Sequence, residues 1–387
     1  MLPPLMVYLH LPWCVRKCPY CDFNSHTAPR ELPEDAYVDA LLADLRADLD
    51  LAAGRRVEAV FMGGGTPSLF SPAAIGRLLA GLRAELPFAA GAEVTMEANP
   101  GTLERGRFEG YAAAGVNRVS LGAQTFSAAQ LERLGRIHGP GDIEAAVADL
   151  RRAGIDNFNL DLMYALPGQD LAGALADLRR ALELGPAHLS HYQLTLEPGT
   201  AFFHRPPPLP DDGLALDMQL ACQEQLAAAG YGQYEVSAYA RTGRQCRHNL
   251  AYWRFEDYLG LGAGAHGKAT LAAGVVRTEK PRLPREYLAQ AARGAGGPRR
   301  EVPAADLPFE YMLNALRLVE GFTLGHFERA TGLESAAVLP ALTALERQGL
   351  MTQGGDRWRP SERGFRFLND LQAAFLEDGR RTTPKVA

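Results

Sequence analysis

Residues 8–23 read YLHLPWCVRKCPYCDF, an apolar run that leads directly into three cysteines with C-x3-C-x2-C spacing. These three, Cys14, Cys18 and Cys21, are most of the five cysteines in the chain. An odd number of cysteines, of which three are clustered, does not resemble a disulfide framework, so the thiolates are available as metal ligands. Three thiolates can hold three irons of a [4Fe-4S] cube and leave the fourth iron open to a small molecule. The alternative is a zinc site completed by His10 or a fourth cysteine, but zinc sites usually combine two C-x2-C pairs.

The composition indicates a globular protein with a sizeable core, since 47% of the 387 residues are hydrophobic. The net charge of -5 gives no basic surface of the kind that nucleic-acid binders carry. No apolar run is long enough to span a membrane, which leaves only peripheral membrane association open. The first residues, MLPP, lack the pattern of a secretory signal, so we expect a cytoplasmic location.

Apolar, β-branched runs alternate with amphipathic helical patterns up to about residue 195. The expected strands lie at residues 6–11, 57–62, 92–97, 118–124, 157–164 and 188–195. Between the first two, apolar residues from Tyr37 to Leu49 recur every three or four positions, and Gly54 follows as a stop signal. Repeated strand–helix units favour a parallel sheet, either doubly wound or curved into a barrel.

The residues at the ends of the expected strands decide between these two arrangements. The cysteines follow the first strand, Gly63–Thr66 follows the second, and Glu97, Gln124, Asp161 and Thr195 lie at the ends of the other four. In a barrel the carboxyl ends of all strands converge on one mouth, so these groups would surround a single pocket. We therefore predict an α/β fold based on an incomplete, TIM-like (βα)6 barrel.

The rest of the chain divides into three further parts after a barrel core at residues 1–200. Residues 201–305 begin with a proline-rich connector and continue as an aromatic and glycine-rich section, of which residues 271–305 are expected to be a loop or boundary. Residues 306–378 show three helical patterns and a short hairpin, which is typical of a winged-helix module. Residues 379–387 are expected to form a tail.

A winged helix raises the question of DNA binding, which the charge of this module answers. From Arg300 to Ala387 the chain has 11 Lys and Arg against 12 Asp and Glu, without a basic cluster. We therefore expect no nucleic-acid partner, and a winged-helix regulator is the weakest hypothesis for function.

Several motifs resemble the radical SAM superfamily and, within it, the oxygen-independent coproporphyrinogen III oxidase family. They are YxHxP at 8–12, the cysteine cluster, GGGTPS at 63–68, MEANP at 96–100, GAQTF at 122–126, NLDLMY at 159–164 and YQLT at 192–195. HNLAYW at residues 248–253, an HNxxYW motif, is similar to the HemW branch of heme chaperones. The resemblance covers nearly the whole chain and implies three cofactors: a [4Fe-4S] cluster, S-adenosylmethionine and heme.

The resemblance also implies the residues of each site. The implied contacts of S-adenosylmethionine are Tyr8, Tyr20, Gly64, Gly65, Thr66, Glu97, Gln124, Arg136 and Asp161. Among them, carboxylates can accept hydrogen bonds from ribose hydroxyls or an ammonium, and the guanidinium can pair with a carboxylate. For heme we expect His248 as the axial ligand, with Tyr252 and Trp253 beside the porphyrin and Cys246 as an alternative ligand. No catalytic residue is assigned.

One departure from the oxidases bears on function. The oxidases carry an additional cysteine two residues after the third cluster cysteine, and here that position is Phe23. We therefore hypothesise a heme chaperone that passes heme to an acceptor protein, whose identity the sequence does not give. The alternative is an oxygen-independent coproporphyrinogen III oxidase that decarboxylates propionate side chains, so whether the protein is an enzyme stays open here.

Overall fold

The computed structural model describes residues 2–101, 106–294 and 296–376. Its largest sheet has 12 strands in the order β14-β13-β12-β11-β1-β4-β5-β6-β7-β8-β10-β9. The six expected strands are consecutive in this order and pair in parallel. They are β1 (Leu5–Leu11), β4 (Val57–Gly64), β5 (Phe88–Ala98), β6 (Arg118–Gln124), β7 (Phe158–Tyr164) and β8 (His188–Gln193). The predicted incomplete barrel is confirmed.

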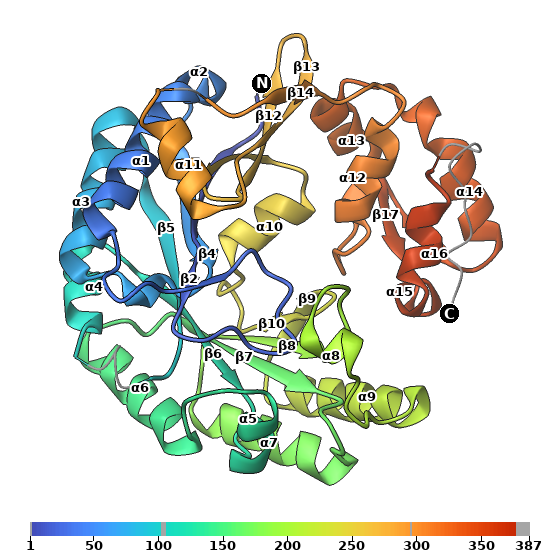
Figure 1. Ribbon diagram of the computed structural model, residues 1–387. Coiled ribbons are helices and arrows are strands. Elements are labelled where there is room, and N and C mark those ends of the chain that lie inside the picture. The colour runs from blue at the N-terminus through green and yellow to red at the C-terminus, as the bar shows by residue number, and fades with distance from the viewer. Residues whose placement is uncertain (1, 102–105, 295, 377–387) are drawn as a thin grey trace.

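Helices follow the parallel strands and cover the outer side of the curved sheet (Figure 1). They are α1 (Glu34–Ala47), α2 (Leu49–Ala52), α3 (Pro72–Glu85), α4 (Phe108–Ala114), α5 (Ala128–Arg133), α6 (Pro140–Arg152) and α7 (Leu171–Glu183). Side-chain caps fix where some of them begin. Ser71 accepts a hydrogen bond from the backbone N–H of Ala74 at the start of α3, and Asp170 caps α7 in the same way.

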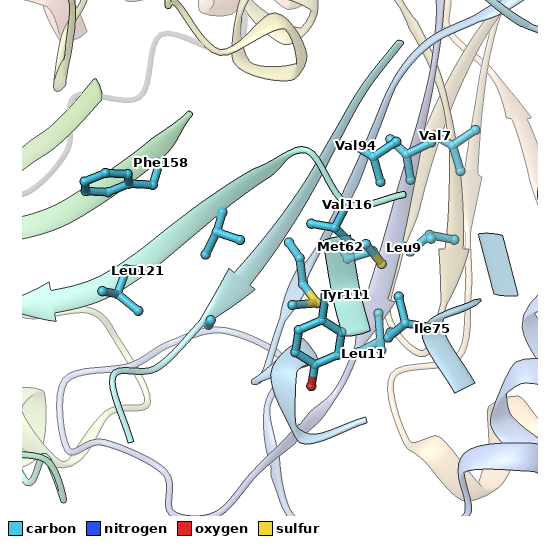
Figure 2. Packing of buried hydrophobic residues seen from close by; sticks show 14 of the residues in the cluster. Val7, Leu9, Leu11, Met62, Ile75, Val94, Tyr111, Val116, Leu121 and Phe158 are labelled. Carbon is cyan, nitrogen blue, oxygen red and sulfur yellow. The ribbon is translucent and has the colours of Figure 1, made fainter. Parts of the chain in front are cut away.

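The core lies between the sheet and these outer helices. In β1, Val7, Leu9 and Leu11 are fully buried and alternate with side chains that point to the inner side of the barrel. Figure 2 shows these three packed with residues of neighbouring strands and helices, including Met62 and Ile75. Each buried aliphatic side chain contributes about 1.5–3 kcal/mol to the free energy of unfolding, so this layer stabilises the positions of the strands.

Residues 201–305 extend the sheet at both edges. On one side, β10 (Ala238–Ala240) runs antiparallel to β8 and pairs with β9 (Gly232–Glu235). On the other side, β11 (Asp257–Gly262) adds a seventh parallel strand next to β1. The helices of this part are α8 (Ala201–His204), α9 (Asp212–Ala228) and α10 (Arg247–Trp253). Figure 1 places α10 near the centre of the molecule, where it packs against β4.

The prediction that residues 271–305 form a loop is wrong. They contain β13 (Gly274–Glu279), which pairs with β12 (His266–Leu271), then α11 (Pro284–Ala291) and β14 (Arg299–Glu301). Each of these elements is short and buries only a few apolar side chains, such as Val275 of β13 in the core of the C-terminal module and Tyr287 of α11 in the main core. Their hydrophobic periodicity is therefore weak.

The C-terminal helical module is confirmed, and it lies on the right of Figure 1 in orange and red. Its helices are α12 (Leu307–Ala315), α13 (Leu324–Thr331), α14 (Leu339–Arg347), α15 (Glu362–Arg366) and α16 (Leu368–Ala373). Its small sheet consists of β15 (Phe322–Thr323), β16 (Met351–Gly354) and β17 (Arg357–Pro360). The module has its own core around Tyr311 and Trp358. The predicted tail, residues 379–387, lies outside the described residues.

Across the described ranges, every helix is too short or too polar to cross a membrane.

Candidate functional site

A cavity of about 570 Å³ opens at the carboxyl ends of the parallel strands. Most of the residues that the sequence predicts as ligands line it. They are Cys14, Cys18, Tyr20, Cys21, Gly64, Gly65, Thr66, Glu97, Gln124, Arg136 and Asp161. Cys14 and Asp161, which are 147 positions apart in the sequence, therefore lie at one mouth. The reason is that parallel strands end at the same edge of the sheet.

The cysteines lie on a loop that begins in the short strand β2 (Trp13–Cys14), which pairs with β3 (His26–Thr27). Within the loop, the backbone N–H of Cys21 donates to the carbonyl of Cys18 at 3.2 Å. Burial raises the pKa of the Cys14 and Cys21 thiols, and hydrogen bonds from Thr66 and Ser25 partly oppose that shift. Metal binding would stabilise the thiolate forms.

The geometry of the donors bears on the zinc alternative. In the part of the chain that the structure describes, no three His, Cys, Asp or Glu side chains converge closely enough to share one metal ion. Moreover, both ring nitrogens of His10 are engaged, with the Tyr8 hydroxyl at 3.0 Å and the Asn24 carbonyl at 2.9 Å. Cys14, Cys18 and Cys21 line one cavity, and three is the number of thiolates that hold a cube with one open iron.

A chain of hydrogen bonds connects two of the cysteines through the cavity wall. Thr66 Oγ1 donates to Cys14 Sγ at 3.5 Å and accepts from Asn99 Nδ2 at 2.9 Å. Asn99 Oδ1 in turn accepts from Arg136 Nη2 at 2.5 Å, and Arg136 Nη1 lies 3.6 Å from Cys18 Sγ. Hydrogen bonds to thiolate sulfur are one means of tuning a cluster, so this chain positions the sulfurs and stabilises their negative charge.

The glycine loop after β4 packs directly against the start of the cysteine loop. The Gly65 and Thr66 N–H groups donate to the carbonyls of Leu11 and Trp13 at 2.9 and 2.8 Å. A Cβ on Gly65 would lie 2.6 Å from the Trp13 carbonyl oxygen, which is a backbone atom that cannot rotate away. Glycine is therefore required here for close approach.

We expect Gly65→Ala to destabilise the cysteine loop and to lower the iron content after reconstitution by about half or more, because the backbone next to Cys14 must shift. Gly141→Ala is the matched control, since a Cβ there meets no atom within 4 Å. Iron and sulfide analysis measures the effect. An unchanged cluster yield in the first variant would show that the loop tolerates the shift.

Among the carboxylates that line the cavity, Glu97 and Asp161 are buried deeply enough to have raised pKa values. Burial, and then the nearby Asp161, raise the pKa of Glu97 to about 8, although the Gly64 N–H donates to it at 3.1 Å. Burial also raises the pKa of Asp161, which accepts hydrogen bonds from Ser120 at 3.1 Å and Asn159 at 2.7 Å. A cavity wall of this kind favours a ligand that carries positive charge.

Some lining residues lie in recognised motifs but were not assigned a role from the sequence. Asn99 is part of MEANP, and Tyr192, in YQLT, donates to Gln124 Oε1 at 3.0 Å. Gln124 has a φ of 68°, a conformation that non-glycine residues rarely adopt and that is enriched at functional sites. Ser120 and Ser190 carried no signal in the sequence, because a serine inside a strand looks like any other half-buried polar residue.

Four predicted site residues do not line this cavity: Tyr8, His248, Tyr252 and Trp253. His248 on α10 is 2% exposed and lies against the rings of Phe61, Tyr252 and Tyr8, at centroid distances of 4.8, 4.6 and 6.0 Å. Burial, followed by the charge of Arg118, lowers the pKa of His248 to about 3. Cys246 is also buried, and its Sγ lies 3.6 Å from Glu93 Oε1. A heme iron could reach His248 only if the surrounding rings moved.

The fold and the three-cysteine cavity together define a radical SAM protein. The family model of the Radical SAM superfamily matches residues 8–181, and that of the HemN C-terminal domain matches residues 302–367. Membership of this superfamily implies a [4Fe-4S] cluster and S-adenosylmethionine.

The chain is 52% identical over 378 residues to heme chaperone HemW of Escherichia coli (strain K12), covering 97% of this chain and 99% of that protein. It is 47% identical over 383 residues to heme chaperone HemW of Haemophilus influenzae, with the same coverage. Among solved structures, coproporphyrinogen III oxidase (HemN) from Escherichia coli superposes with a TM-score of 0.81 at 24% identity, covering 97% of this chain and 90% of that one, which concerns the fold alone. The chain belongs to the HemW heme chaperone family.

Proposed function

We propose that the protein is a heme chaperone that binds heme and delivers it to an acceptor protein. The observation that carries this proposal is the 52% identity to a heme chaperone over nearly the full length of both chains. The acceptor is not identified, and the cytoplasmic location stays a prediction.

The barrel mouth would hold the cluster on Cys14, Cys18 and Cys21 and S-adenosylmethionine beside it. The charges of the cavity support this assignment. Glu97 and Asp161 suit a cationic ammonium or ribose hydroxyls, and the Arg136 guanidinium suits a carboxylate. The remaining contacts would come from Tyr20, Gly64, Gly65, Thr66 and Gln124. Tyr8 does not line the cavity and would support the site through its hydrogen bond to His10. When bound, the cluster would be able to supply an electron for cleavage of S-adenosylmethionine.

Phe23 distinguishes this proposal from the oxidase alternative. The side chain is 59% exposed and lies at the rim of the cavity with Val15 and Ile137, which are 44% and 63% exposed. An apolar ring at this position cannot take the role of the additional cysteine in the oxidases. The oxidase activity therefore lacks one of its expected groups.

We expect the anaerobically reconstituted full-length protein to bind about one hemin per chain, with a dissociation constant near or below about 1 μM. The measurement is a titration followed through the heme Soret band, with and without the cluster. A spectrum identical to that of free hemin would contradict heme binding.

The oxidase alternative needs a separate assay with reductant, S-adenosylmethionine and coproporphyrinogen III. We expect no vinyl product at catalytic turnover. Turnover would show that the protein is a decarboxylase.

A further inference from the structure

A row of hydrogen-bonded side chains runs from the barrel mouth into the interior of the barrel. At the mouth, Asp161 accepts hydrogen bonds from Ser120 Oγ at 3.1 Å and from Asn159 Nδ2 at 2.7 Å. Behind it, His188 Nδ1 lies 2.7 Å from Asn159 Oδ1, and His188 Nε2 lies 2.8 Å from the Tyr234 hydroxyl. Asn159 and His188 are each 1% exposed, and neither lines the cavity. They can therefore affect a ligand at the mouth only through the side chains in front of them.

The direction of each hydrogen bond in this row follows from the groups that form it. The Asp161 carboxylate only accepts, so the nitrogen of the Asn159 amide faces it and the oxygen faces His188. Burial, followed by the charge of Arg118, holds the pKa of His188 well below its ordinary value, so the imidazole is neutral and has one N–H. That proton lies on Nδ1, because the amide oxygen cannot donate, and Nε2 accepts from Tyr234. Every hydrogen bond is therefore donated toward Asp161, and successive bonds polarise one another.

The row fixes the orientation of the Asp161 carboxylate and leaves part of it to the cavity. A carboxylate has about four positions at which it can accept a hydrogen bond. Ser120, Asn159 and Ser190 each donate to Asp161, and their hydrogen bonds oppose the rise that burial causes in its pKa. Asp161 itself lines the cavity, so the remaining position is available to a donor group of a ligand.

We propose that Asn159 and His188 are positioning residues of the barrel mouth, which hold the Asp161 carboxylate in the orientation that binds S-adenosylmethionine. The inference rests on the proposed function, in which Asp161 contacts that ligand. The row also reaches α10, because the side chain of Asn249, the second residue of the HNxxYW motif, is hydrogen-bonded to the Tyr234 hydroxyl. The same side chains therefore link α10 to the ligand site at the other end of the barrel.

Two substitutions of His188 separate a positioning role from a merely structural one. His188→Asn places an amide N–H where Nδ1–H lies and keeps the donor to Asn159, whereas His188→Gln reaches the Nε2 position and loses that donor. Equilibrium dialysis of the full-length, anaerobically reconstituted protein measures the dissociation constant of S-adenosylmethionine, and iron analysis shows that the variants carry equal amounts of cluster. We expect the constant to stay within about twofold for His188→Asn and to rise about tenfold for His188→Gln.

His191→Gln is the matched control for these variants. His191 is a buried histidine on the same strand, β8, but it stacks on Tyr164 and does not line the cavity. Its substitution should leave the affinity for S-adenosylmethionine unchanged.

A second pair of variants tests the row without a change of side-chain shape, and it decides the matter if the His188 variants do not fold. Tyr234→Phe removes the hydroxyl that donates to His188 and should weaken binding of S-adenosylmethionine by about threefold. Tyr231→Phe removes a buried hydroxyl that donates to the Pro186 carbonyl outside the row, and it should have no effect.

The outcomes separate the positioning role from the site itself. If the wild-type protein binds S-adenosylmethionine and His188→Gln and Tyr234→Phe bind it equally well, the positioning role is overturned and the ligand site stands. Equal losses in His188→Asn and His188→Gln would also overturn it, because the donor to Asn159 would then be irrelevant. If the wild-type protein does not bind S-adenosylmethionine, the proposed site at the barrel mouth is itself contradicted.

Discussion

We expect the replacement of Cys18 by alanine to remove the proposed iron–sulfur cluster, and with it the broad visible absorption of the reconstituted protein. The reason is that Cys14, Cys18 and Cys21 are the cysteines that line the cavity in the described part of the chain, so a cube held by them and deprived of one would be bound at only two corners. Iron content should fall from about four per chain to near zero. Iron and sulfide analysis after anaerobic reconstitution, together with the absorption spectrum, measures the change.

Cys222→Ala is the matched control, because Cys222 is buried on α9 and does not line the cavity. It removes one thiol without touching the mouth of the barrel and should keep the full cluster. Loss of the cluster from both variants would point to general destabilisation. Full retention in Cys18→Ala would mean that the cysteine loop is not the ligand set.

The fold could be predicted from the sequence wherever burial leaves a periodic pattern. The parallel strands are buried on both sides, so β4 reads as a nearly continuous apolar run, and the glycines that follow it mark its end. In contrast, β14 (Arg299–Glu301) is exposed along its whole length and is held by backbone pairing to β13. Nothing in the side chains of Arg-Arg-Glu distinguishes such a strand from a loop.

The site residues, too, fall into those that could be placed from the sequence and those that could not. Residues next to strand ends could be placed at one mouth because topology alone brings them together, as it does for Glu97 and Asp161. His248 could not be placed, since the sequence does not say which face of α10 is covered by Phe61.

Glu97 is expected to lower the stability of the ligand-free protein as the pH rises. Its pKa is about 8 in the folded protein and near its ordinary value in the unfolded chain, so folding favours the protonated form. The contribution of protonated Glu97 to the free energy of unfolding is therefore complete at a pH below the unfolded pKa of about 4.3. It is lost as the pH rises through the folded pKa of about 8. The full pKa shift of Glu97 corresponds to a change of roughly 5 kcal/mol in the free energy of unfolding. Because the cavity is open to water, we expect a change of only about 1–2 kcal/mol.

Glu97→Gln should therefore raise the apparent midpoint of thermal unfolding by about 2–4 °C at pH 9 and by much less at pH 5. Glu132→Gln, at an exposed position on α5, is the control and should change neither value. With S-adenosylmethionine at high pH, the wild type should unfold at a higher temperature than Glu97→Gln. The reason is that a bound cationic group is attracted to the Glu97 carboxylate and not to a neutral amide. Thermal scans from pH 5 to 9, with and without S-adenosylmethionine, test both effects. A ligand-induced shift equal in the wild type and in Glu97→Gln would remove Glu97 from the binding site, because the buried charge would then have no counterpart in the ligand.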